Sequence, residues 1–169
     1  ELNTHTRYLT DAVVAYAERL TAKFPHPLTQ VMYACTGSEA VDLALRIARL
    51  ATGGQGIIVT RNAYHGTTAA VAEISPSLGV NNRIPASVAL VDAPDSVRGP
   101  GGDAAVVQWV REIERAIAGF AEQGIPFAGM IVDSVLSSDG LRLDPAGFLA
   151  RAAETVRAAG GLYIADEVQ

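Results

Sequence analysis

The chain has 169 residues, of which 49% are hydrophobic and 18% charged, and its formal net charge is −5 at pH 7. This length and composition suit a globular α/β domain with a substantial core and exclude a disordered chain. The negative charge offers no electrostatic footprint for a nucleic acid or an anionic membrane. The single cysteine, Cys35, excludes an internal disulfide and fits a reducing compartment, so a cytoplasmic protein is expected.

The chain is expected to be a piece of a longer protein. It begins at Glu1 without an initiator methionine, and it stops at Gln169 directly after an apolar segment. No apolar run approaches the roughly 20 residues that a membrane-spanning helix needs. Residues 1–169 are therefore expected to form part of a single α/β domain.

The first third of the chain predicts a helix, a strand and a second helix. Apolar residues recur every three or four positions from Leu9 to Phe24, which indicates an amphipathic helix that two nearby prolines would end. A short buried strand is expected over residues 31–35. Residues 36–39, Thr-Gly-Ser-Glu, have the form of a capping box that starts the next helix. Since the polar residues of that helix form one narrow stripe, it should be largely buried.

The rest of the chain alternates strands with helices. Strands are expected over residues 57–60, 88–91, 128–133 and 162–165, the last of them apolar on both faces like a central strand. Between them we expect a short helix over residues 67–73, a long helix capped by Asp103, and a helix begun by Asp144 and Pro145. This alternation predicts a mostly parallel sheet with helices on both faces.

Candidate binding residues fall at the carboxyl ends of these strands, where such sheets bind ligands. Gly37 and Ser38 lie on the first turn of a helix, whose free amides can hold a phosphate, although a simply capped core helix fits residues 36–39 equally well. Tyr64 offers an aromatic face, and Asp166 is a carboxylate at the mouth of an apolar strand. Pyridoxal 5′-phosphate has the matching parts: a phosphate, a flat ring and a pyridine nitrogen that a carboxylate keeps protonated.

Three motifs in this order resemble the class III pyridoxal-phosphate aminotransferases of fold type I. They are residues 33–40 (YACTGSEA), 63–66 (AYHG) and 161–169 (GLYIADEVQ). The resemblance extends over nearly the whole chain. A narrower likeness, to the branch of ethanolamine-phosphate phospho-lyase and alanine–glyoxylate aminotransferase 2, rests on residues 2–4, 7–9, 42–46, 74–76 and 98–100.

The resemblance implies a role for each candidate residue. The amides of Gly37 and Ser38 would hold the cofactor phosphate, and the ring would lie between Tyr64 on one face and Val168 on the other. Asp166 would pair with the pyridine nitrogen as the catalytic carboxylate. The remaining cofactor-binding residues would be Gln169, near the ring hydroxyl, and His65, for which a hydrogen-bonded structural histidine is the alternative.

The resemblance also implies a homodimer that acts on an amine or amino acid and a keto acid, and no metal site is predicted. The sequence departs from the family in two places, with Val41 where Asn is usual and Asp133 where Glu is frequent. The chemistry further needs a lysine that carries the cofactor as a Schiff base. The only lysine is Lys23, and the family places the required one beyond Gln169, so residues 1–169 alone should be inactive.

Several functions remain open from the sequence. A pyridoxal-phosphate enzyme could transfer an amino group, or it could expel phosphate from a phosphorylated amine. A catalytically silent α/β domain kept for binding or assembly would explain the missing lysine. A nucleotide-binding domain is a further alternative, although neither G-x-G-x-x-G nor G-x-x-x-x-G-K-[ST] occurs.

Overall fold

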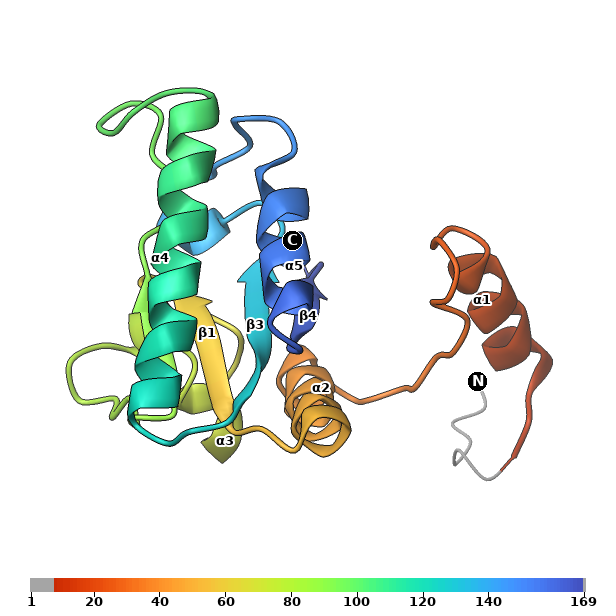
Figure 1. The fold of residues 1–169 in the computed structure, drawn as a ribbon. Helices are drawn as coiled ribbons and strands as arrows, with labels where there is room; N and C mark the ends of the chain where they lie inside the picture. Colours follow the sequence, from red (N-terminus) through yellow and green to blue (C-terminus); the bar gives the residue numbers. More distant parts are fainter. Residues whose placement is uncertain (1–7, 169) are drawn as a thin grey trace. The chain divides into compact units, whose positions relative to one another are not determined.

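A computed structural model describes residues 8–168 of the chain. Two compact units make up the chain, Glu1–Ala34 and Cys35–Gln169, and the strands, with the helices that pack on them, fall within the second (Figure 1). Residues 2–4 and Arg7 of the narrower family likeness lie outside the described residues, as does the candidate site residue Gln169.

The first unit contains one helix, α1 (Asp11–Thr21), as the apolar periodicity predicts. Residues 31–35, however, are irregular, so the strand expected there is wrong. The side chain of Tyr33 attaches this run to α1 instead: its hydroxyl donates to the carbonyl oxygen of Val13 at 3.0 Å, and its ring centroid lies 6.3 Å from that of Tyr16. A short apolar run becomes a strand only where a partner strand accepts its backbone hydrogen bonds.

The second unit is built on a four-stranded parallel sheet in the order β2-β1-β3-β4, which confirms the predicted architecture (Figure 1). Its strands are β1 (Gly56–Thr60), β2 (Val88–Val91), β3 (Phe127–Asp133) and β4 (Leu162–Asp166). Within the described residues β4 pairs with β3 alone, so the central position expected for this strand is not found here. The register places Asp133 on β3 opposite Asp166 on β4.

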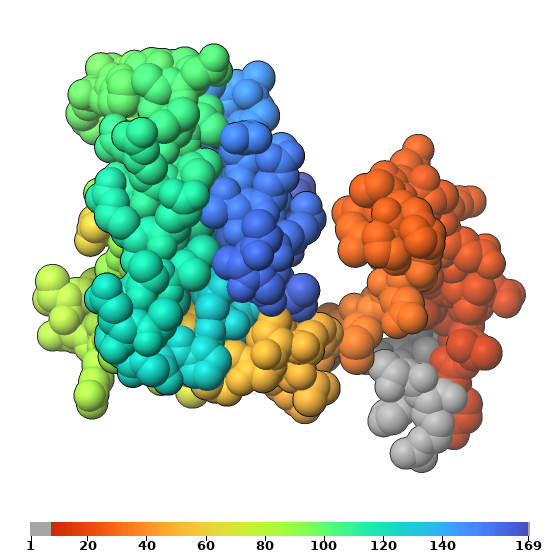
Figure 2. Space-filling model, viewed as in Figure 1, coloured from red at the N-terminus to blue at the C-terminus, as the bar shows by residue number. Residues whose placement is uncertain are grey.

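Helices cover both faces of the sheet. On one face α4 (Asp103–Glu122) and α5 (Phe148–Ala158) lie side by side (Figures 1 and 2). They bury a core that includes Trp109, Ile113, Phe120, Phe148 and Val156. On the other face α2 (Gly37–Thr52) and the short α3 (Ala69–Ala72) bury Val41, Leu45 and Val71 against β1 and β3. Two 3₁₀ turns, Pro76–Leu78 and Ser137–Asp139, complete the connections.

Helix α2 starts as its capping box predicts. The Oγ1 of Thr36 accepts a hydrogen bond from the amide of Glu39 at 3.1 Å, and the Glu39 carboxylate accepts one from the amide of Cys35 at 2.8 Å. The expectation that α2 is largely buried is wrong for this chain, because the sheet covers only one side of it. Leu45 is fully buried, whereas Leu50 is 87% exposed.

The starts of the other two long helices differ from the prediction. Gly102 occupies the N-cap position of α4, so Asp103 is the first helical residue rather than the cap. Helix α5 begins at Phe148, after Gly147, and Asp144 and Pro145 belong to the turn before it. In both cases the backbone enters the helix at a glycine, without a side-chain cap. Among residues 8–168, no helix is both long and apolar enough to cross a membrane.

Candidate functional site

A pocket of about 230 Å³ lies between the first turn of α2, the loop after β1 and the end of β4. Six of the seven predicted site residues line it, and the seventh, Gln169, lies outside the described residues. The full lining consists of Thr36, Gly37, Ser38, Val41, Tyr64, His65, Gly66, Asp166 and Val168. The fold therefore brings three segments that are far apart in sequence to one place.

The first turn of α2 supplies hydrogen-bond donors to the pocket. The amides of Glu39 and Ala40 are taken by the side chain and the carbonyl oxygen of Thr36. No acceptor within residues 8–168 pairs with the amides of Gly37 and Ser38, which sit at the positive end of a 16-residue helix. A Cβ at Gly37 would lie 4.0 Å from Cγ2 of Val168, so any larger side chain would extend into the pocket. This end of the pocket suits an anion.

The loop after β1 packs tightly on the start of α2. The amide of Thr67 donates to Oγ of Ser38 at 3.0 Å. Gly66 has a φ of +130°, and a Cβ there would lie 2.9 Å from Cα of Ser38. Glycine is required at this position because the backbone approaches the helix so closely.

The side chain of Ser75 holds the same loop through hydrogen bonds to its backbone. Ser75 was not predicted as a site residue from the sequence. It is fully buried, and its Oγ accepts from the amide of His65 at 3.0 Å. The same hydroxyl lies 3.0 Å from the carbonyl oxygen of Gly66 and 2.9 Å from that of Val71, to which it donates. The sequence offers only one signal for Ser75, its place in the family-like run of residues 74–76.

The end of β4 supplies a carboxylate to the pocket. The Oδ2 of Asp166 lies 2.8 Å from Nδ1 of His65, and the two side chains are 9% and 0% exposed. The Oδ1 of Asp166 has a single, long contact, 3.4 Å from the amide of Val168. One oxygen of this nearly buried carboxylate thus remains available to a proton donor in the pocket. Tyr64, which is half-exposed, also lines the pocket.

Asp133 stands where the family often has the longer Glu, and its carboxylate forms hydrogen bonds within its own loop. Its carboxylate accepts hydrogen bonds from the amides of Val135 at 3.0 Å and Ser137 at 2.8 Å, and from the Ser137 hydroxyl. Burial raises the pKa of Asp133, but the Ser137 hydroxyl and the two amides outweigh it, so the pKa lies below its usual value. Asp133 therefore stabilises the turn after β3 and does not line the pocket.

This arrangement predicts a pH-dependent stability. We expect Asp133→Asn to lower the free energy of unfolding of the whole protein by about 1–2 kcal/mol at pH 7, because an amide replaces the charged acceptor. The fold favours the ionised form, so its contribution is complete above the unfolded pKa of 3.8 and is lost as the pH falls through the lowered folded pKa. Urea unfolding at several pH values checks this.

The exposed Asp92, whose side chain is 64% accessible, provides the control for that experiment. Asp92→Asn should change the free energy of unfolding by less than about 0.5 kcal/mol. If the difference in free energy of unfolding between wild type and Asp133→Asn stays constant down to pH 2, the ionised Asp133 does not stabilise the turn.

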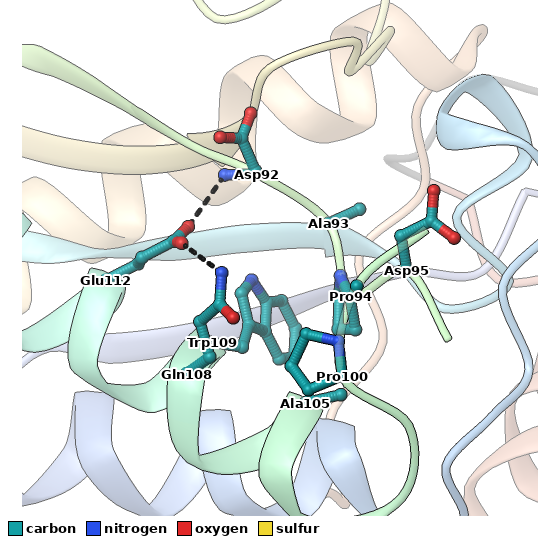
Figure 3. Close-up of a pocket in the computed structure, with 10 residues that line it drawn as sticks. Asp92, Ala93, Pro94, Asp95, Pro100, Ala105, Gln108, Trp109 and Glu112 are labelled. Carbon is teal, nitrogen blue, oxygen red and sulfur yellow. Dashed lines mark hydrogen bonds between the residues drawn. The ribbon is translucent and has the colours of Figure 1, made fainter. Parts of the chain in front are cut away.

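A second pocket, of about 150 Å³, lies between the end of β2 and the start of α4 and is lined by three acidic side chains (Figure 3). Each carboxylate already has a donor from the chain. Asp92 accepts from Arg61 at 2.6 Å, Asp95 forms two hydrogen bonds with Arg142 at 3.0 and 2.8 Å, and Glu112 accepts from the amide of Asp92 at 3.2 Å (Figure 3). These contacts stabilise the loop after β2, so the first pocket is the better candidate site.

The fold and the first pocket together define an α/β domain of the cofactor-binding kind, with unpaired amides and a nearly buried carboxylate at the carboxyl ends of parallel strands. The chain belongs to the class III aminotransferase family, whose model matches residues 3–169. This confirms the family resemblance that the three sequence motifs indicate.

Two curated relatives and two solved structures show how far the similarity extends. The alanine–glyoxylate aminotransferase 2-like protein of Drosophila melanogaster is 36% identical, over 99% of this chain and 36% of its own length. The mitochondrial alanine–glyoxylate aminotransferase 2 homolog 2 of Arabidopsis thaliana is also 36% identical, over 96% of this chain and 34% of its own.

Among solved structures, a phospholyase from Arthrobacter in complex with phosphoethanolamine is 39% identical with a TM-score of 0.89, over 99% of this chain and 40% of its own. An amine transaminase from an uncultivated Pseudomonas species, in its PLP-bound form, is 29% identical with a TM-score of 0.79. This match covers 99% of this chain and 40% of the transaminase chain. The family and this PLP-bound relative indicate pyridoxal phosphate as the cofactor. The chain spans well under half the length of each of these relatives.

Proposed function

We propose that the protein carrying this chain is a pyridoxal-phosphate-dependent aminotransferase, which moves an amino group from an amine or amino acid to a keto acid. One observation carries the proposal. The unpaired amides of Gly37 and Ser38 and the nearly buried carboxylate of Asp166 line the same pocket. The amides suit the phosphate of the cofactor, and the carboxylate suits its pyridine nitrogen.

Each residue of the pocket has a role in this proposal. The amides of Gly37 and Ser38 bind the phosphate, helped by the dipole of α2. Asp166 holds a proton on the ring nitrogen through its Oδ1, while Tyr64 and Val168 lie against the two faces of the ring and exclude water. The family resemblance assigns Gln169 to the ring hydroxyl. When bound, pyridoxal phosphate supplies an electron-accepting ring for the electron pair left at the substrate carbon.

A phospho-lyase is the second candidate, in which the protein eliminates phosphate from a phosphorylated amine. The similarity to the Arthrobacter phospholyase, 39% identical with a TM-score of 0.89, favours it. Both reactions use the same cofactor pocket. Incubating the purified protein with phosphoethanolamine, and separately with alanine and glyoxylate, distinguishes them: inorganic phosphate is released in the first case and glycine is formed in the second.

A homodimer and a cytoplasmic location complete the proposal. The dimer rests on the family resemblance, and light scattering on the whole protein tests it. The cytoplasmic location rests on the single, unpaired Cys35. The Arabidopsis relative carries a name that places it in mitochondria, so cell fractionation decides between the two compartments.

The covalent attachment of the cofactor gives a direct test of the proposed function. Lys23 is exposed in the turn after α1 and is not among the residues that line the pocket. We expect the whole protein to develop a visible absorbance band with pyridoxal phosphate, and borohydride reduction to leave the adduct on a lysine outside residues 1–169. Peptide mapping locates it, and Lys23→Arg should bind the cofactor unchanged.

Two results would contradict the proposal. A reduced adduct on Lys23 would contradict the expectation that the cofactor is attached to a lysine outside residues 1–169. Failure of the whole protein to develop the absorbance band would favour the catalytically silent domain.

A further inference from the structure

The imidazole of His65 is placed to act on Asp166 rather than on a ligand. Its side chain is 0% exposed, although the residue is among those that line the pocket. Nδ1 lies 2.8 Å from Oδ2 of Asp166, and because an ionised carboxylate only accepts hydrogen bonds, Nδ1 is the donor. Within residues 8–168, Nε2 has no partner. The ring therefore makes one directional contact, and that contact is to the carboxylate.

The backbone that carries the ring is fixed on two sides. The amide of His65 donates to Ser75, which is fully buried, and the next residues are held by the close approach of Gly66 to Ser38. Asp166, by contrast, comes from β4, which has one neighbouring strand among the described residues. A rigid loop thus holds a side chain from the edge of the sheet, 101 residues away in sequence.

The hydrogen bond determines which oxygen of Asp166 remains free. With Oδ2 bonded to His65, rotation of the carboxylate is restricted and Oδ1 keeps only its long contact with the amide of Val168. Two further carboxylates near this pair are already bonded: Asp133, opposite Asp166 in register, within its own turn, and Glu167 to the hydroxyl of Ser134. His65 is therefore the side chain that orients Asp166.

We propose that His65 is a positioning residue, which holds Asp166 so that Oδ1 faces the ring nitrogen of the bound cofactor. The inference rests on the proposed function, since it names how a residue outside direct contact sets the geometry of that same site. The competing explanation is that His65 merely fills space beneath the loop. The two explanations predict opposite effects for a matched pair of substitutions.

Asparagine and leucine have side chains of nearly equal size and shape, but only asparagine carries a donor where His65 has Nδ1. We expect His65→Leu to weaken pyridoxal phosphate binding by roughly tenfold to a hundredfold, the range for losing a hydrogen bond to a charged group. His65→Asn should stay within about threefold of wild type, because its amide restores that bond. Titration of the whole protein, followed by visible absorbance, measures both.

A second readout separates positioning from packing. With ¹⁵N-labelled pyridoxal phosphate, the nitrogen chemical shift reports the protonation of the ring nitrogen. We expect the protonated fraction to fall in His65→Leu and to be kept in His65→Asn. If space filling alone mattered, leucine would be the better substitute, because a buried amide without partners is destabilising.

If His65→Leu binds pyridoxal phosphate as tightly as His65→Asn or more tightly, and keeps at least as large a protonated fraction, the inference is overturned. The proposed cofactor site would be unaffected by that result. Absence of binding by the wild-type protein would overturn the proposed function and, with it, this inference. If His65→Leu fails to fold, His65→Gln takes its place, since its longer side chain carries the amide near Nε2 rather than Nδ1. Asparagine should then bind the cofactor more tightly than glutamine, and the reverse order would overturn the inference.

Discussion

Replacing Asp166 by alanine should leave a folded protein whose turnover falls by roughly a hundredfold to several thousandfold. The carboxylate is 9% exposed and hydrogen-bonded to a fully buried histidine, so its loss removes the acceptor for the ring nitrogen and leaves Nδ1 of His65 without a partner. Breaking such a buried pair costs about 3–5 kcal/mol, which gives this rate effect if the interaction acts in the transition state. Steady-state kinetics of the whole protein, with circular dichroism as the folding check, measures it.

Asp92→Ala is the matched control for this substitution. Asp92 also follows a parallel strand directly, but its carboxylate is 64% exposed and pairs with Arg61 at 2.6 Å, outside the lining of the first pocket. An exposed ion pair contributes little, so turnover should remain within about twofold of wild type. Near-normal turnover in Asp166→Ala would mean that another group holds the ring nitrogen and that the catalytic assignment is mistaken.

The second large effect is expected at Gly66, where alanine should destabilise the protein by more than about 3 kcal/mol and weaken cofactor binding. Two costs combine here. The φ of +130° is strained for any residue with a Cβ, at about 1–3 kcal/mol, and the new methyl group would meet Ser38 with its Cα only 2.9 Å away. Relieving that contact displaces the turn that presents the amides of Gly37 and Ser38. Urea unfolding and absorbance titration with pyridoxal phosphate measure the two consequences.

Gly79→Ala separates strain from steric contact. Gly79 has a φ of +102°, yet nothing lies within 4 Å of the Cβ position, so alanine there should show the backbone cost alone. We expect it to lose about 1–3 kcal/mol and to bind the cofactor as wild type does. Equal effects of the two substitutions on cofactor binding would show that the contact between Gly66 and Ser38 does not support the phosphate-binding turn.

The elements of the second unit could be predicted closely from the sequence because their signals are local. The apolar run at residues 57–60 and the Thr36–Glu39 capping box are each read from consecutive residues, and both appear in the fold as predicted. The alternation of strands and helices then leaves few arrangements besides a parallel sheet. For the same reason the three family motifs could be recognised without a structure.

The local signals failed where a competing contact or a glycine decided the outcome. Residues 31–35 are as apolar as a strand, but the hydroxyl of Tyr33 bonds to α1 and no partner strand among the described residues takes up the backbone. Asp103 and Asp144 are good capping residues by type, yet the backbone enters α4 and α5 at glycines instead. The preference of a residue type for the N-cap position is therefore outweighed here by the backbone path that leads into each helix.

Only the tertiary structure decided how the site works as a unit. Asp166 and His65 could be predicted as site residues from the sequence, but their hydrogen bond could not. It joins residues 101 positions apart, and no periodicity or spacing in the sequence indicates it. Ser75 is an ordinary serine in sequence and becomes a support only because the loop after β1 folds over it. Residue type determines which hydrogen bonds a polar side chain is able to make, whereas the packing of distant segments determines which of them it makes.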